Sequence, residues 1–196
     1  HARTRPARGA VEATRRLCAL ASRADSPIYI VHMNAGGEAD VLQAARRLGQ
    51  PVMGETCPQY LFFTEADLER RDGAKWVCSP PLRARVDNDR LWHGLADGDI
   101  QVLATDHCAF FYNGDRSILY EGKRIAIPGK ELGVDDFTRI PNGLHGVGDR
   151  LPVPPAAVNR QRLQPDGIEI GNPLAHRNRV GHPVFRPAVF YGRCLA

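Results

Sequence analysis

The chain has 196 residues, of which 43% are hydrophobic and 24% are charged, and its net charge is +4 at pH 7. This composition is typical of a soluble globular protein with one domain, and no apolar run approaches the ~20 residues of a membrane-spanning helix. The excess positive charge lies entirely in residues 151–196, so the rest of the chain is electrically balanced. We therefore expect neither a nucleic-acid partner nor a membrane partner.

Helix and strand patterns alternate along the first half of the chain. Apolar residues recur at helical spacing over 11–25, and the short apolar run PIYIVHM predicts a strand over 27–33. A second helix is predicted over 36–49, where Gly49 provides a stop signal. The segment PVMGETCP then predicts a second strand over 51–58.

The same alternation continues to residue 107. The segment KWVCSPP predicts a strand over 75–81, DNDRLWHGLADGD a helix over 87–99, and IQVLATDH a strand over 100–107. Apolar strands joined by helices and short connections indicate parallel βαβ units, and therefore an α/β fold. In such folds, ligand sites form at the C-terminal ends of the strands.

Four side chains able to do chemistry occur at the predicted strand ends: His32, Cys57, Ser79 and Asp106. Taken singly, the histidine is explained as a strand-end residue with satisfied hydrogen bonds, and the serine and aspartate as turn or cap formers. Their shared location makes a metal site the sharper hypothesis, because His and Asp are zinc ligands. Catalytic zinc takes three protein ligands, however, so the pattern alone is compatible with a metal hydrolase without establishing one.

The number and spacing of the cysteines indicate the redox compartment of the protein. The chain has five, without a CxxC pair, which is typical of a reducing compartment, and we expect a cytoplasmic protein. By default Cys57, Cys78 and Cys108 are expected to be small buried apolar residues. The segment 109–150 is rich in glycine and turn formers, and its length predicts a functional loop rather than a plain connection.

Five motifs follow one another within residues 1–153, and their combination is specific: IYIVHM, GETCPQYLFFTEADL, AKWVCSPPLR, LWHGLADGDIQVLATDHCAF and PGKELGVDDFTRIPNGLHGVGDRL. Together they resemble the dihydropyrimidinase and hydantoinase family of cyclic amidohydrolases. The resemblance implies a partial (β/α)8 TIM barrel, roughly its strands 6–8. It also implies two divalent metal ions, usually zinc, a cyclic amide substrate (a dihydropyrimidine or a hydantoin), and a homotetrameric full-length protein.

The resemblance also implies roles for individual residues. His32 matches a metal ligand, and Asp106 matches a residue that both binds metal and acts as general base. Ser79 and Asn142 match residues that hold the ring amide through their backbone groups. The chemistry is coherent, because a metal-bound hydroxide is a nucleophile at neutral pH and a neighbouring carboxylate can carry its proton to the leaving nitrogen.

Two departures from the family pattern qualify these expectations. The family's other metal ligands would precede His1, and none occurs in the chain, so we expect the chain alone to be inactive. The resemblance ends near residue 153, and residues 154–196 are rich in arginine and proline. We expect this tail to be disordered or to result from a slipped reading frame. The alternative function is that of a non-catalytic dihydropyrimidinase-related binding or scaffold protein, although His32 and Asp106 favour the enzyme.

Overall fold

The computed structural model describes residues 1–114, 116–127 and 129–146. The Arg/Pro-rich tail, residues 154–196, lies outside this part of the chain, so its predicted lack of a fixed fold stays a prediction. Within the described residues, no helix is both long enough and apolar enough to cross a membrane.

A sheet of three parallel strands forms the centre of the protein. Its order is β1 (Ile28–Ile30), β2 (Val52–Thr56) and β3 (Val102–Leu103). Ile28 pairs with Val52 at one side, and Glu55 pairs with Val102 at the other. The predicted α/β class with parallel strands is therefore confirmed, although each strand is shorter than its apolar run in the sequence.

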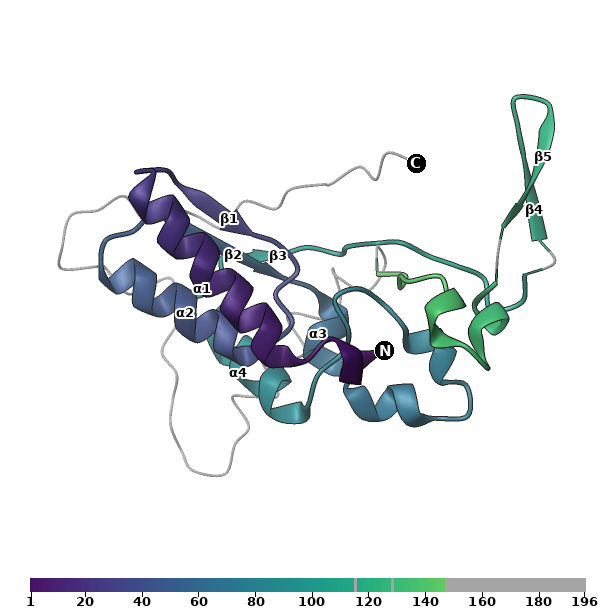
Figure 1. Cartoon of the computed structure of the whole chain (residues 1–196), viewed down its shortest axis with the longest axis horizontal. Helices are drawn as coiled ribbons and strands as arrows, with labels where there is room; N and C mark the ends of the chain where they lie inside the picture. Colours follow the sequence, from purple (N-terminus) through teal and green to yellow (C-terminus); the bar gives the residue numbers. More distant parts are fainter. Residues whose placement is uncertain (115, 128, 147–196) are drawn as a thin grey trace.

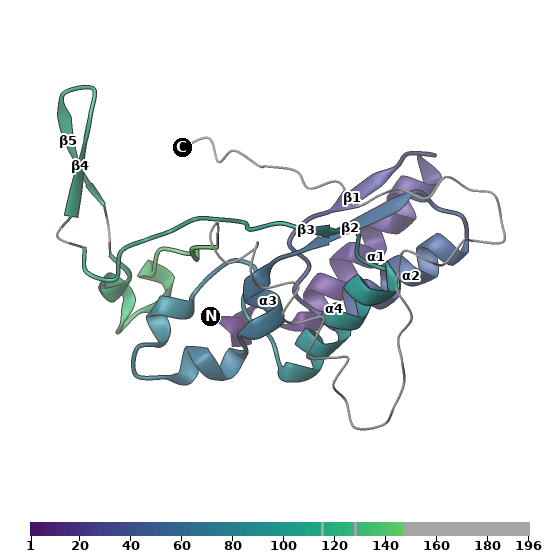
Figure 2. The ribbon, with the colours of Figure 1, turned by 180° about the vertical axis from the view of Figure 1, so that it is seen from behind.

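Three helices pack on one face of this sheet, as the two opposite views in Figures 1 and 2 show. They are α1 (Ala7–Arg23), α2 (Gly36–Arg47) and α4 (Arg85–Asp97), and a short helix, α3 (Pro58–Phe62), follows β2. The helix α1 buries Thr14, Cys18 and Ala21, whose spacing places them on one side of a helix. The predicted helices are thus present, with α1 beginning earlier than the sequence pattern indicated.

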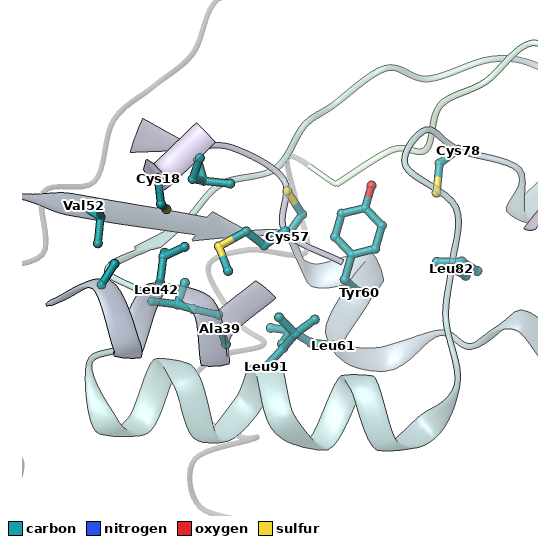
Figure 3. Close-up of a cluster of buried hydrophobic side chains, with 14 of the residues drawn as sticks. Cys18, Ala39, Leu42, Val52, Cys57, Tyr60, Leu61, Cys78, Leu82 and Leu91 are labelled. Carbon is teal, nitrogen blue, oxygen red and sulfur yellow. The ribbon is translucent and has the colours of Figure 1, made fainter. Parts of the chain in front are cut away.

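The core lies between the sheet and these helices. Leu42 of α2, Leu61 of α3 and Leu91 of α4 are each at most 1% exposed, and Figure 3 shows them between β2 and α4. A fully buried leucine contributes about 1.5–3 kcal/mol. Gly54 of β2 allows α2 to approach closely, because a Cβ there would lie 2.4 Å from Leu42 Cδ2.

The opposite face of the sheet is largely uncovered by the described residues. Tyr29 and Val31 are 44% and 41% exposed, although parallel sheets in proteins are normally covered on both faces. Helices on the outside and an open inner face are the arrangement of a barrel wall. Closure into a (β/α)8 barrel stays a prediction.

The chain between α3 and α4 corrects one expectation. Residues 75–81 do not form a strand: the 3-10 helices η2 (Glu65–Glu69) and η3 (Gly73–Trp76) precede an irregular segment through Ser79. Pro80 and Pro81 have no backbone N–H to donate to a strand ladder. The carbonyl groups of this segment therefore take their partners from elsewhere in the protein.

The segment after β3 contains more regular structure than its glycine content suggested. Strands β4 (Arg116–Tyr120) and β5 (Lys123–Ile127) form an antiparallel hairpin that projects from the body in both views (Figures 1 and 2). The short 3-10 helices η4 (Lys130–Gly133) and η5 (Phe137–Arg139) follow, and a further one, η1 (Ala2–Thr4), opens the chain. The predicted long loop is therefore only partly irregular.

Candidate active site

His32 lies two residues beyond the end of β1 and is held there by the neighbouring strand. Its backbone N–H donates to Glu55 Oε1 at 3.4 Å, and the hydroxyl of Tyr29 donates to the other oxygen of the same carboxylate. The φ angle of His32 is 41°, a left-handed conformation that a residue with a Cβ seldom adopts. The Glu55 carboxylate therefore fixes the point at which the chain turns away from the sheet and carries the imidazole with it.

Asp106 occupies the equivalent place after β3. It is exposed, and its φ angle is 44°, so both predicted metal ligands have left-handed backbones. Left-handed conformations of this kind cluster at functional sites, where the surrounding structure must hold them. Beyond Asp106, the Cys108 amide donates to the Leu144 carbonyl at 2.9 Å, which anchors the chain that leaves the strand.

His32 and Asp106 lie at the same edge of the sheet but do not form a complete metal site. They follow β1 and β3, which are separated by β2, so the two strand ends are about 10 Å apart. No group of three or more His, Cys, Asp and Glu side chains able to hold a metal ion occurs within the described residues. Since a catalytic zinc ion takes three protein ligands, these two residues do not provide a full zinc site.

Cys57 lies between them, directly after β2, and is fully buried. Burial raises the pKa of its thiol well above the ordinary value, and the negative charges of Asp106 and Glu55 raise it further. In the absence of a neighbouring cation, the thiol therefore stays protonated at neutral pH. The expectation of buried cysteines is confirmed for Cys57 and Cys78 but is wrong for Cys108, which is exposed.

Ser79 and Asn142 are brought together from positions 63 residues apart. The Ser79 hydroxyl donates to Asn142 Oδ1 at 3.1 Å, while Asn142 Nδ2 donates to the Ile140 carbonyl at 2.9 Å. Both residues are exposed. Within the described part of the chain, their backbone N–H and C=O groups have no hydrogen-bond partner. Two exposed residues whose side chains are in contact can thus offer backbone donors and acceptors to a ligand.

The segments that carry this pair are fixed by neighbouring backbone groups. The Gly143 amide donates to the Val77 carbonyl at 3.1 Å, and His1 Nε2 lies 2.8 Å from the Cys78 carbonyl, which can only accept. Gly143 has a φ angle of 155°, and a Cβ there would lie 2.2 Å from the Cys108 carbonyl oxygen. The glycine is therefore required for the loop to approach the chain beyond β3.

A surface hollow of about 430 Å³ connects the two halves of the site. His32 and Ser79 both line it, together with Pro80 and the two arginines Arg5 and Arg83. Asp106 and Asn142 do not line this hollow. The structure thus brings Ser79 into contact with Asn142 and places His32 and Ser79 on the same hollow, while Asp106 follows the far strand of the same sheet edge.

Two polar residues near the site were not predicted from the sequence. Glu55 lies in the apolar strand β2. Because side chains alternate along a strand, Glu55 points to the face opposite that of Val52 and Gly54, so its position on the uncovered face of the sheet could have been predicted. Lys130 is only 3% exposed, but nothing in its local sequence indicates burial. Its role depends on contacts with a segment more than 50 residues away.

Comparison with known proteins gives the chain a family. No family model matches it, but it is 44% identical over 153 residues to a D-hydantoinase of Streptomyces coelicolor, covering 77% of the chain and 30% of that protein. It is 42% identical over 152 residues to D-phenylhydantoinase of Escherichia coli, with 77% and 30% covered. The chain belongs to the dihydropyrimidinase and D-hydantoinase family.

A solved structure supports the same relationship. The crystal structure of dihydropyrimidinase from Brevibacillus agri superposes with a TM-score of 0.64 and 40% identity, over 74% of this chain and 29% of that one. Since this identity is well above the level at which only the fold is shared, the likeness concerns the family as well as the architecture. The chain spans about a third of the length of the curated relatives it matches.

Proposed function

We propose that this chain contributes part of the active site of a metal-dependent cyclic amidohydrolase that opens the ring amide of hydantoins or dihydropyrimidines. The observation that carries the proposal is the Ser79–Asn142 pair, whose backbone groups have no hydrogen-bond partner within the described residues and whose serine lines the same hollow as His32. A cyclic amide presents a ring N–H and a ring carbonyl next to each other. Adjacent peptide N–H and C=O groups are complementary to both.

In this proposal, Ser79 and Asn142 bind and orient the ring amide. Asp106 accepts a proton from the water molecule whose oxygen attacks the ring carbonyl carbon. It returns this proton to the ring nitrogen as the C–N bond breaks, because an exposed carboxylate can serve as base and then as acid. His32 and Asp106 would be two of the ligands that hold divalent metal, which would supply polarisation of the ring carbonyl. Further ligands would have to come from outside the described residues, and a homotetrameric assembly is proposed only for the full-length protein.

Two cyclic amides and a blocked analogue test the binding step. Hydantoin and dihydrouracil, added to the isotope-labelled chain, should shift the amide resonances of Ser79 and Asn142, while the Met33 amide within the sheet should not respond. The matched control is 1,3-dimethylhydantoin, which has no ring N–H and should bind at least tenfold more weakly. Shifts confined to other parts of the chain would contradict the proposal.

A turnover assay tests the dependence on further ligands. We expect no ring opening by the chain alone in the presence of zinc, because two protein ligands hold the ion weakly and orient it poorly. Sustained hydrolysis of hydantoin by the purified chain, abolished by a chelator, would show that the two ligands are sufficient. The alternative of a non-catalytic binding protein has no observation in its favour among the relatives compared, which are named as enzymes.

A further inference from the structure

Lys130 is a buried lysine that has no carboxylate partner among the described residues. It is 3% exposed, and no ion pair within the described residues includes it. Its Nζ instead donates to two backbone carbonyls, that of Val77 at 2.7 Å and that of Lys75 at 3.0 Å. Burying an ammonium group is unfavourable unless it is hydrogen-bonded to strong acceptors. The two hydrogen bonds to backbone carbonyls therefore offset part of the cost of burying Lys130.

The Val77 carbonyl is shared between Lys130 and the loop that carries Asn142. It accepts from Lys130 Nζ and also from the Gly143 amide at 3.1 Å, using both of its lone pairs. Because residues 75–79 are not in a strand, their carbonyls have no ladder partners, and buried carbonyls need a donor. Lys130 supplies donors on one side of this segment, and Gly143 supplies one on the other.

These contacts join two segments whose side chains also meet in the Ser79–Asn142 hydrogen bond. Ser79 is two residues beyond Val77, and Asn142 directly precedes Gly143. A movement of the Val77 carbonyl therefore displaces both open backbone groups. Burial lowers the pKa of Lys130 to about 8, against attraction from Cys78 and Cys108, so the group is still charged at neutral pH.

We propose that Lys130 is a positioning residue, which holds the Val77 carbonyl so that the backbone groups of Ser79 and Asn142 keep the spacing a ring amide requires. The proposal rests on the function proposed above for these two residues. Lys130 touches neither the substrate nor the reacting atoms. Its effect passes through one carbonyl and should appear as a change of order and affinity at the Ser79–Asn142 pair.

Amide hydrogen exchange and ligand titration of Lys130→Met test this role. Methionine is unbranched like lysine and one atom shorter, but it has no donor, so the Gly143 amide should exchange about tenfold to a hundredfold faster. The dissociation constant of hydantoin, measured from the Ser79 and Asn142 resonances, should rise at least fivefold. The Met33 amide should keep its protection within twofold, and the exposed Lys123→Met variant should match the unchanged protein in all three measurements.

Each outcome decides the matter. Unchanged exchange at Gly143 in Lys130→Met would overturn the proposal, as would equal loss of protection at Gly143 and Met33, because Lys130 would then support the fold as a whole. In the unchanged protein, a through-hydrogen-bond coupling between Lys130 Nζ and the Val77 carbonyl carbon is expected, and its absence would also overturn it. Failure of hydantoin to bind the unchanged protein would contradict the proposed function. The exchange result would still test whether Lys130 holds the Val77 carbonyl in place.

Discussion

The two halves of the candidate site are held by different kinds of contact. His32 and Asp106 stand at the ends of parallel strands whose backbones pair and whose helix-covered face rests on a continuous apolar core. Ser79 and Asn142 lie on irregular segments that are joined by single hydrogen bonds from distant residues. The first half therefore depends on the stability of the whole body, whereas the second can be loosened locally.

The largest effect should come from the core beneath the strand ends. Leu42→Ala removes a fully buried side chain of α2 that packs on β2, and we expect the free energy of unfolding to fall by about 2–5 kcal/mol. Urea denaturation measures this change. Leu48→Ala, at a leucine 88% exposed, should alter it by less than about 0.5 kcal/mol. If Leu42→Ala loosened only the Ser79–Asn142 pair, the strand-end half would not depend on the core, contrary to the conclusion above.

A buried carboxylate tests the chain just after His32. Glu38 is 5% exposed and accepts from the amides of Asn34 and Ala35 at 3.0 and 2.9 Å, and from the Thr14 hydroxyl at 3.0 Å. Glu38→Ala leaves these donors unpaired, and we expect a loss of about 3 kcal/mol in thermal or urea unfolding. The exposed Glu12→Ala is the control and should change stability by less than about 1 kcal/mol.

The second half of the site should have its own pH dependence. The folded pKa of Lys130 is about 8, below its ordinary 10.5, so between these values the unfolded chain binds more protons than the folded protein. The stability contribution of Lys130 therefore rises with pH, and relative to Lys130→Met the unchanged protein should gain about 2 kcal/mol from pH 7 to 10. Urea unfolding of both proteins across this range measures the difference, with Cys78 and Cys108 present in both. A difference that does not vary with pH would contradict the buried charge.

The smallest effect is expected at the surface of the loop pair. Ser79→Ala removes the hydroxyl that donates to Asn142 at 3.1 Å, and an exposed hydrogen bond of this kind contributes less than about 1 kcal/mol. Hydantoin affinity should fall less than threefold, because the backbone groups remain. A loss of binding would show that the hydroxyl itself, rather than the peptide, recognises the ligand.

The sequence predicted the strand-end half better than the loop half for a physical reason. Apolar runs and helical spacing indicate parallel βαβ units. His32 and Asp106 stand near the ends of two of the apolar runs, so their location at the strand ends can be predicted from the sequence. The segment at 75–81 has the same apolar character but ends in two prolines, and the prediction of a strand there was wrong. Periodicity cannot show where the carbonyls of such a segment find their donors.

Contacts across large sequence separations account for the rest. Ser79 was singled out at a predicted strand end, but Asn142, and the connection between the two, came only from the family resemblance, since nothing in their local sequences links them. Lys130 and Glu55 act on carbonyl and amide groups that belong to other segments, and a single sequence does not indicate such pairings. The hairpin β4–β5 was not predicted either. Its glycines and charged residues obscured the alternation of apolar and polar side chains in its short strands.

The left-handed backbones of His32 and Asp106 affect which residues these two positions accept. At φ angles of 41° and 44°, glycine is favoured over a residue with a Cβ by about 1 kcal/mol, so both positions sacrifice stability for their side chains. A gene copy that is still selected for a stable fold, but no longer for activity, would tolerate glycine at 32 and 106. Comparing these two codons among closely related strains would therefore show whether the lineage still uses the chemistry.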